Sequence, residues 1–113
     1  MATPHLRSGE IINLIAADEQ SLTVPAHALF KDAHLEVIHM NLVAGKSFPS
    51  HHVNGPITIQ CLSGDLQITV ETGKKALRAG DLLYLAADVP HAVLAITNTS
   101  FLVTMVLLKT AMQ

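Results

Sequence analysis

The sequence predicts an all-β domain, because short apolar segments and turn signals alternate along almost all of its length. The turns are rich in Gly, Asn, Asp and Ser, as in Asn54-Gly55-Pro56 and Thr72-Gly73-Lys74. They recur roughly every eight to twelve residues, which is the spacing of sandwiches and barrels. No segment has the sustained apolar periodicity of a long helix. The pattern is therefore typical of a sandwich or barrel of short strands.

The composition indicates one domain with few charged side chains. The 113 residues are 50% hydrophobic and 14% charged, whereas about 25% charged residues is usual. A chain of this length forms a single domain with a real core. So few charges cover the surface of a small monomer poorly, so we expect part of the apolar surface to be buried in a homodimer.

Charge and segment patterns argue against several classes of protein. The net charge is −2 and the seven Lys and Arg are scattered, so no basic stripe is present for nucleic acid. The apolar run at 101–108 is too short to cross a membrane, and Glu10 and Asn13 interrupt any signal peptide. The single cysteine, Cys61, fits a reducing compartment. We therefore expect a cytoplasmic protein that binds neither nucleic acid nor membranes.

The first elements along the chain are short. Residues 11–15 are an apolar patch that fits either a strand or one turn of helix. Asp32-Ala33 is expected to be a turn. Residues 34–43 then read as a strand, with residues 35, 37 and 39 on one face and residues 36, 38, 40 and 42 on the other. Because both faces are largely apolar, we expect this strand to be covered on both sides or to lie in an interface.

The remaining strands are predicted from short apolar runs bounded by turn residues, at 57–62, 66–70, 82–85, 91–97 and 101–108. Residues 63–65 are predicted to be a hairpin turn that pairs strand 66–70 back onto strand 57–62. The other turns are predicted at 72–74, 79–81 and 98–100, and a loop at 86–90.

Three histidines beside these strands are the candidate metal ligands. His51 and His52 are adjacent on the approach to strand 57–62, and His91 begins strand 91–97. Neutral imidazole binds several transition metals, so histidines that converge inside a barrel can hold Fe, Ni, Cu, Zn or Mn. Neighbouring residues of a regular strand point to opposite faces. Either a bulge lets both His51 and His52 point inward, or one of them lies at the surface.

Five other residues are candidates for a ligand pocket. Ile57, Ile59 and Val93 suit a small organic molecule. Gln60 is a candidate weak ligand or substrate contact, although its parity with Ile57 favours a structural hydrogen bond instead. Tyr84 either lines the pocket or packs in the core with its hydroxyl satisfied. Cys61 lies beside them and is expected to be a small buried hydrophobe rather than a nucleophile.

The two histidine segments resemble the motifs of the cupin family. Gly45, His51 and Gly64 keep the frame of the first motif, and Gly80 and His91 keep the frame of the second. The resemblance covers residues 34–108, with residues 1–33 as an N-terminal extension with edge strands, within one domain at 1–113. It implies a jelly-roll barrel, also called a double-stranded β-helix, of two antiparallel sheets that is usually dimeric and has a pocket inside.

The sequence also departs from those motifs. Ile57 stands where the family carries its metal-binding Glu, and the second histidine of the first motif is either replaced by Val53 or supplied by His52. In the second motif, Ala86 and Asp88 replace a proline and a glycine. One of the three ligands of the first motif is thus present, a neighbour is a candidate substitute, and the carboxylate is missing.

Three hypotheses for function follow, and the first is favoured because loss of the carboxylate weakens a metal site without abolishing one made of histidines. In the first, His51 and His91, with His52 as a third candidate, hold a divalent metal ion that supports an oxygenase- or isomerase-like activity on a small organic molecule. In the second, the barrel binds or senses a small organic ligand without metal. In the third, the chain is a dimeric structural domain whose site has degenerated.

Overall fold

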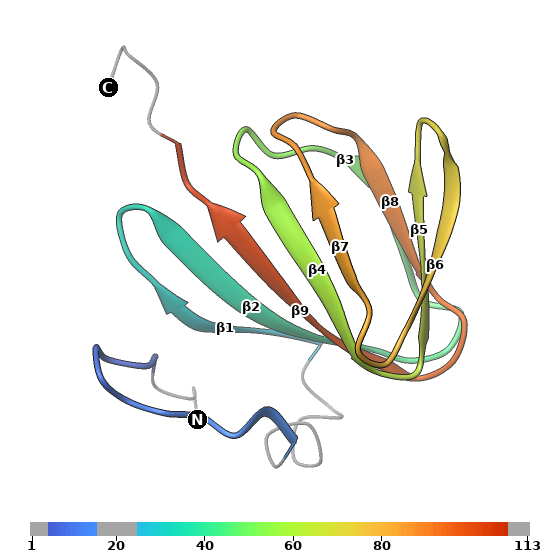
Figure 1. The fold of residues 1–113 in the computed structure, drawn as a ribbon. Helices are drawn as coiled ribbons and strands as arrows, with labels where there is room; N and C mark the ends of the chain where they lie inside the picture. The colour runs from blue at the N-terminus through green and yellow to red at the C-terminus, as the bar shows by residue number, and fades with distance from the viewer. Residues whose placement is uncertain (1–4, 16–24, 109–113) are drawn as a thin grey trace.

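The computed structural model describes residues 5–15 and 25–108, in which the strands form two antiparallel sheets that face each other (Figure 1). The broad sheet has the order β1 (Ala26–Lys31), β2 (Leu35–Leu42), β9 (Thr99–Val106), β4 (Ile57–Ser63), β7 (Leu82–Leu85). The second sheet has the order β3 (Ser47–His51), β8 (His91–Ala95), β5 (Asp65–Val70), β6 (Gly73–Arg78). The predicted all-β jelly-roll barrel, or double-stranded β-helix, is confirmed.

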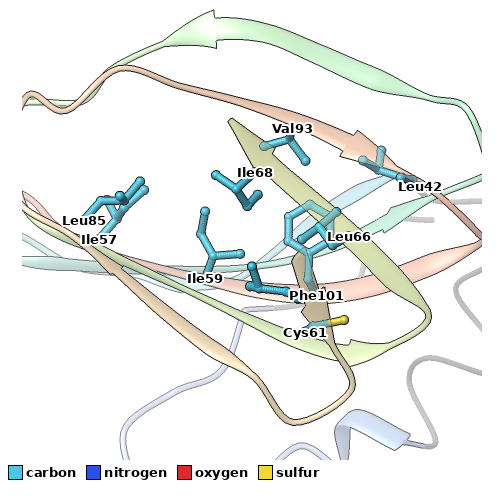
Figure 2. Packing of buried hydrophobic residues seen from close by; sticks show 11 residues of the cluster. Leu42, Ile57, Ile59, Cys61, Leu66, Ile68, Leu85, Val93 and Phe101 are labelled. Carbon is cyan, nitrogen blue, oxygen red and sulfur yellow. The ribbon is translucent and has the colours of Figure 1, made fainter. Parts of the chain in front are cut away.

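Strand alternation builds the core between the two sheets. On β4, Ile57, Ile59 and Cys61 are buried, while the residues between them are partly exposed. Figure 2 shows Ile68 of the second sheet and Phe101 of the broad sheet pointing into the same space. Burying a side chain of this size contributes about 1.5–3 kcal/mol. The apolar runs of the sequence therefore hold the two sheets together.

Cys61 lies in this core, as expected for a small buried hydrophobe. Its side chain is fully buried. Burial raises the pKa of the Cys61 thiol, and the nearby charges of Asp65 and Asp81 raise it further. The thiol is therefore kept protonated, which is the unreactive form.

The turn between β1 and β2 is fixed by one carboxylate. The backbone N–H groups of His34 and Leu35 both donate to Oδ1 of Asp32, each at 2.8 Å. These two hydrogen bonds favour the charged carboxylate and lower the pKa of Asp32. The predicted turn at 32–33 thus has a local cause, because a short Asp side chain can bond the backbone two and three residues ahead. Residues 14 and 15 are helical, so the patch at 11–15 ends in helix rather than strand.

The predicted hairpin at 63–65 is wrong. β5 does not pair with β4: it leaves the broad sheet and pairs with β6 and β8. Gly64, with φ of +83°, turns the corner, and a Cβ atom at this position would lie 2.2 Å from the carbonyl oxygen of Asn98. The glycine therefore sends the chain from one sheet to the other instead of reversing it.

Other elements differ from the prediction too: β3 was not predicted as a strand, and the predicted strand 91–97 ends at Ala95. β6 was not predicted, and it forms the true hairpin with β5. β9 begins at Thr99, inside the predicted turn at 98–100, where the single hydrogen of the Thr99 hydroxyl is shared between the carbonyl oxygens of Asp65 at 2.9 Å and Thr97 at 2.8 Å. Within 5–15 and 25–108, no helix is long and apolar enough to cross a membrane.

Candidate functional site

The register of β3 and β8 brings two of the predicted histidines together. His51 ends β3, His91 begins β8, and the two are cross-strand partners. Their ring centroids are 4.4 Å apart, and the ring planes are inclined by 54°. His51 is exposed and His91 is 4% exposed. The pair therefore links solvent with the interior of the barrel.

Each ring is oriented by a backbone carbonyl two residues before it. Nδ1 of His51 lies 3.2 Å from the carbonyl oxygen of Pro49, and Nδ1 of His91 lies 3.1 Å from that of Val89. A carbonyl oxygen only accepts, so Nδ1–H is the donor in both bonds. When the rings are neutral, each Nε2 therefore keeps its lone pair for another partner.

The two imidazoles are the polar part of an otherwise apolar cavity of about 380 Å³. The cavity lies between the sheets, and β2, β9 and β4 supply much of its wall. Its other lining residues are all apolar: Ile38, Met40, Phe48, Pro49, Val53, Ile57, Ile59, Val93, Phe101, Val103 and Met105. The cavity thus has an apolar wall and two nitrogen acceptors that lie close together.

Burial changes the proton affinity of one of the two histidines. Desolvation penalises the imidazolium and lowers the pKa of His91 below its ordinary value. The hydrogen bond to the Val89 carbonyl opposes this effect, and the positive charge that His51 can carry adds to it. His91 is therefore neutral at neutral pH, the form in which Nε2 accepts a hydrogen bond.

The structure separates the sequence-predicted site residues into two groups. His51, His91, Ile57, Ile59 and Val93 all line the cavity. His52, Gln60 and Tyr84 do not. His52 is exposed just after β3 ends, so the alternative with one histidine inward and one at the surface describes the pair.

Gln60 and Tyr84 lie on the other face of the broad sheet. Gln60 is out of phase with the inward-facing Ile57 and Ile59 on β4. Tyr84 pairs with Thr58, which is also out of phase, and 65% of its surface is exposed. Both side chains therefore point away from the cavity, and neither is placed to contact a ligand inside it.

Most residues of the cavity wall were not predicted from the sequence. Ile38 and Met40 come from β2, and Phe101, Val103 and Met105 come from β9. The alternation of side chains along the predicted strands 34–43 and 101–108 could have identified these residues as members of one face. Choosing the inward face of each strand required the pairing of β2 and β9 with β4, which a single sequence does not display.

One unusual backbone position, at Asp88, is hydrogen-bonded to a residue of the cavity wall. Asp88 has φ of +65°, and its N–H donates to the carbonyl oxygen of Val53, a cavity residue, at 2.8 Å. Asp is among the few non-glycine residues that adopt this left-handed conformation readily. Position 88 is where the resembled motif carries glycine, the residue that adopts this conformation most readily.

The donor set does not fit a full metal centre. Catalytic zinc sites have three protein ligands, and the cavity offers two imidazoles. Val53 and Ile57, at the positions expected for a histidine and a glutamate, are hydrocarbon side chains in the cavity wall. In the described part of the chain, no group of three or more His, Cys, Asp or Glu side chains is placed to hold a metal ion.

Comparison with known proteins agrees with this architecture. A family model described as a cupin domain matches residues 38–107. No curated protein matches the sequence significantly.

Solved structures share the fold at low sequence identity. A conserved protein of unknown function from Streptococcus pyogenes has a TM-score of 0.77 and 18% identity over 97% of each chain. A cupin superfamily protein from Desulfitobacterium hafniense has a TM-score of 0.70 and 21% identity over 73% of this chain and 75% of that one. An RmlC-like cupin with a double-stranded β-helix fold from Methanocaldococcus jannaschii has a TM-score of 0.67 and 20% identity over 72% and 77%.

Proposed function

This chain belongs to the cupin family, and we propose that it is a barrel that binds a small organic molecule without needing a metal ion. The ligand has an apolar body and one hydrogen-bond donor, which the imidazoles of His51 and His91 hold. The observation that supports this proposal is the apolar cavity whose polar groups are two paired histidines. The expected cytoplasmic location stays part of the proposal, supported by the one buried cysteine, Cys61.

The cavity limits the size and character of the ligand. At about 380 Å³, it is near the lower end of the roughly 300–1,000 Å³ of ligand pockets. Apolar walls hold water poorly, so an apolar body gains free energy when it enters. A ligand with several charges would leave them desolvated and unpaired. We therefore expect a compact ligand about the size of a substituted benzene ring.

The two imidazoles define the polar group of that ligand. Both Nδ1–H groups are already donated to carbonyl oxygens, so both neutral rings offer only acceptors. A phenol or an enol supplies the matching O–H. An ether or a hydrocarbon of the same shape leaves the acceptor of the buried His91 without a partner, which costs about 1–3 kcal/mol.

A metal ion held by histidine is the second candidate, and one observation favours it. A metal-binding histidine usually donates its other ring N–H to a carbonyl or carboxylate, and both rings do so here. His51 and His91 would hold the ion, with water or ligand in its other positions. We place this candidate second because two imidazoles are fewer than the usual three protein ligands. The oxygenase- or isomerase-like activity expected from the resemblance would depend on that ion.

The test compares two probes that differ in the donor. Untagged protein in EDTA is titrated by calorimetry with para-ethylphenol and with para-ethylanisole, which has the same apolar body but no O–H. We expect the phenol to bind about ten- to hundredfold more tightly, the equivalent of losing about 1–3 kcal/mol at an unsatisfied buried acceptor. Saturation should also raise the melting temperature, because the ligand binds the folded state.

Substitutions then assign the preference to the site. His51→Ala and His91→Ala should each reduce the preference for the phenol to within about threefold. The matched control is His52→Ala, which removes an exposed ring outside the cavity and should keep the wild-type ratio. Equal binding of the two probes by wild-type protein would sink the proposal. A preference that appears only when Zn²⁺, Ni²⁺ or Fe²⁺ replaces EDTA would favour the second candidate.

A further inference from the structure

The cavity between the sheets has two different ends, and the strand order shows at which end the histidines lie. Leu66, near the start of β5, pairs with Ala95 at the end of β8. Because β5 follows directly after β4, Ala95 lies at the same end of the barrel as the end of β4. His91, at the start of β8, therefore lies at the opposite end, together with Ile57 at the start of β4. We call this the histidine end of the cavity.

Phe101 lies at the other end of the cavity. Its cross-strand partner is Cys61, near the end of β4. Ile57, at the histidine end, pairs instead with Met105, which lies farther along β9. Figure 2 shows the same arrangement, with Ile57 and Phe101 toward opposite ends of the cluster and Ile59 between them.

The interior beyond Phe101 is filled. Phe101 lines the cavity and is only 1% exposed, and its cross-strand partner on β2, Met40, lines the cavity beside it. Cys61, Leu66 and Ala95 lie at the same end of the barrel, are at most 1% exposed and do not line the cavity. Protein interiors are packed closely and leave little free space. The ring of Phe101 is therefore the floor of the cavity.

We propose that Phe101 sets the length of the ligand, which is a para-substituted phenol with a short unbranched tail that ends against the Phe101 ring. This inference rests on the proposed function, because it takes the hydroxyl to be held by His51 and His91. The tail points inward because His51 is exposed at the histidine end, whereas Phe101 is buried. A hydroxyl beside Phe101 and Met40 would lose its water without finding a polar partner on either side chain.

The strand geometry gives the length of that tail. Cys61 follows Ile57 by four residues on β4, and a strand rises about 3.3 Å per residue, so the histidine end and the floor are separated by about 13 Å. A hydrogen bond of about 2.8 Å at one end and a carbon contact of about 4 Å at the other leave about 6 Å from the oxygen of the ligand to its last carbon. Para-ethylphenol has this length. A longer tail must displace Phe101 or draw the hydroxyl away from the histidines.

The test is a series of phenols that differ only in the length of the para tail. Compounds from para-methylphenol to para-pentylphenol are titrated by calorimetry into untagged protein in EDTA, each beside its methyl ether. Every methylene that is buried before the floor is reached should tighten binding about fourfold. Affinity should therefore rise from para-methylphenol to para-ethylphenol and fall from para-propylphenol onward.

Substitutions then assign the break in this series to the floor. Phe101→Leu should make para-propylphenol or para-butylphenol the tightest binder, because the smaller side chain deepens the cavity. The matched control is Leu77→Ala, which removes as many carbon atoms from the same core cluster at a position that does not line the cavity. It should keep para-ethylphenol as the tightest binder. Circular dichroism shows whether each variant is folded, and the break in the wild-type series tests the floor without any substitution.

Three results would overturn this inference and leave the proposed function standing. The first is a wild-type affinity that rises steadily to para-pentylphenol. The second is a folded Phe101→Leu variant that still prefers para-ethylphenol. The third is a Leu77→Ala variant whose preference shifts as far as that of Phe101→Leu. If the wild type binds the phenols no better than their methyl ethers, the proposed function fails, and this inference fails with it.

Discussion

At His91, burial and hydrogen bonding act on one imidazole in opposite directions. Loss of water disfavours the imidazolium, while the Val89 carbonyl favours a ring that carries a proton at Nδ1. Burial is the larger effect, so the pKa of His91 is lower in the folded protein than its ordinary value of 6.5. The unfolded chain therefore binds more protons between the two values, and stability must rise with pH there.

This direction predicts a loss of stability in weak acid. The contribution of neutral His91 is fully present above pH 6.5 and is lost as the pH falls through the folded-state value. Urea unfolding between about pH 7.5 and about pH 5 measures the slope. His91→Gln should reduce this slope. His52→Gln, which alters a ring that water reaches in both states, should keep it, and equal slopes in wild type and His91→Gln would contradict the argument.

At the scale of elements, the corner at Gly64 decides which sheet β5 joins. Its positive φ favours glycine, and the carbonyl of Asn98 and the hydroxyl of Thr99 leave no room for a side chain. Thr99 also donates to the carbonyl oxygen of Asp65, immediately after the corner. The start of β9 is thus in direct contact with the start of β5.

Gly64→Ala should destabilise the protein by about 2–5 kcal/mol, because backbone strain and overpacking add together. Gly80→Ala is the matched control: its φ of +95° is similar, but no atom lies within 4 Å of the added Cβ. It should cost only the conformational term of about 1–2 kcal/mol. Urea denaturation compares the two variants, and equal losses would show that the contact with Asn98 is unimportant.

Local patterns predicted most of the strands, and contacts between residues far apart in the sequence explain several of the errors. The alternation on β4 was readable because Ile57 and Ile59 are buried on one face. β6 escaped prediction because, of its six residues, only Leu77 is buried and three are basic. The hairpin at 63–65 was predicted wrongly because the contacts that prevent it come from Asn98 and Thr99, far along the chain.

The candidate site, too, was predicted only in part. The glycine spacing around His51 and His91 indicated that both belong to one site, but their 4.4 Å separation depends on the register of β3 against β8. The alternation of side chains along the predicted strand 57–62 already indicated that Gln60 points away from the cavity. Tyr84 could not be assigned, since the facing of β7 follows only from its pairing with β4.

At the scale of the whole molecule, one core joins both sheets. Ile68 comes from the second sheet and is completely buried, and it points toward the residues of the broad sheet (Figure 2). Side chains from both sheets belong to a single cluster. A defect on either side should therefore weaken the entire barrel and not one sheet alone.

Ile68→Ala should lower the free energy of unfolding by about 2–5 kcal/mol, through lost burial and the cavity left behind. Ile96→Ala makes the same chemical change at a site that is 51% exposed and should cost less than about 1 kcal/mol. Tyr84 fluorescence and far-ultraviolet circular dichroism should give the same urea midpoint in each variant, as a single cooperative unit requires. Separate midpoints for the two probes would show that the sheets unfold independently.

The strands of the broad sheet place side chains alternately on its two faces, and this limits how the sequence can change in evolution. Along β4, Ile57 and Ile59 line the cavity, whereas Thr58 and Gln60 lie on the opposite face of the sheet. Replacing one residue alters one face only, whereas inserting or deleting one residue inverts both faces at once. Sequence drift in this wall is thus confined to substitutions, and changes in length must accumulate in the connections between strands.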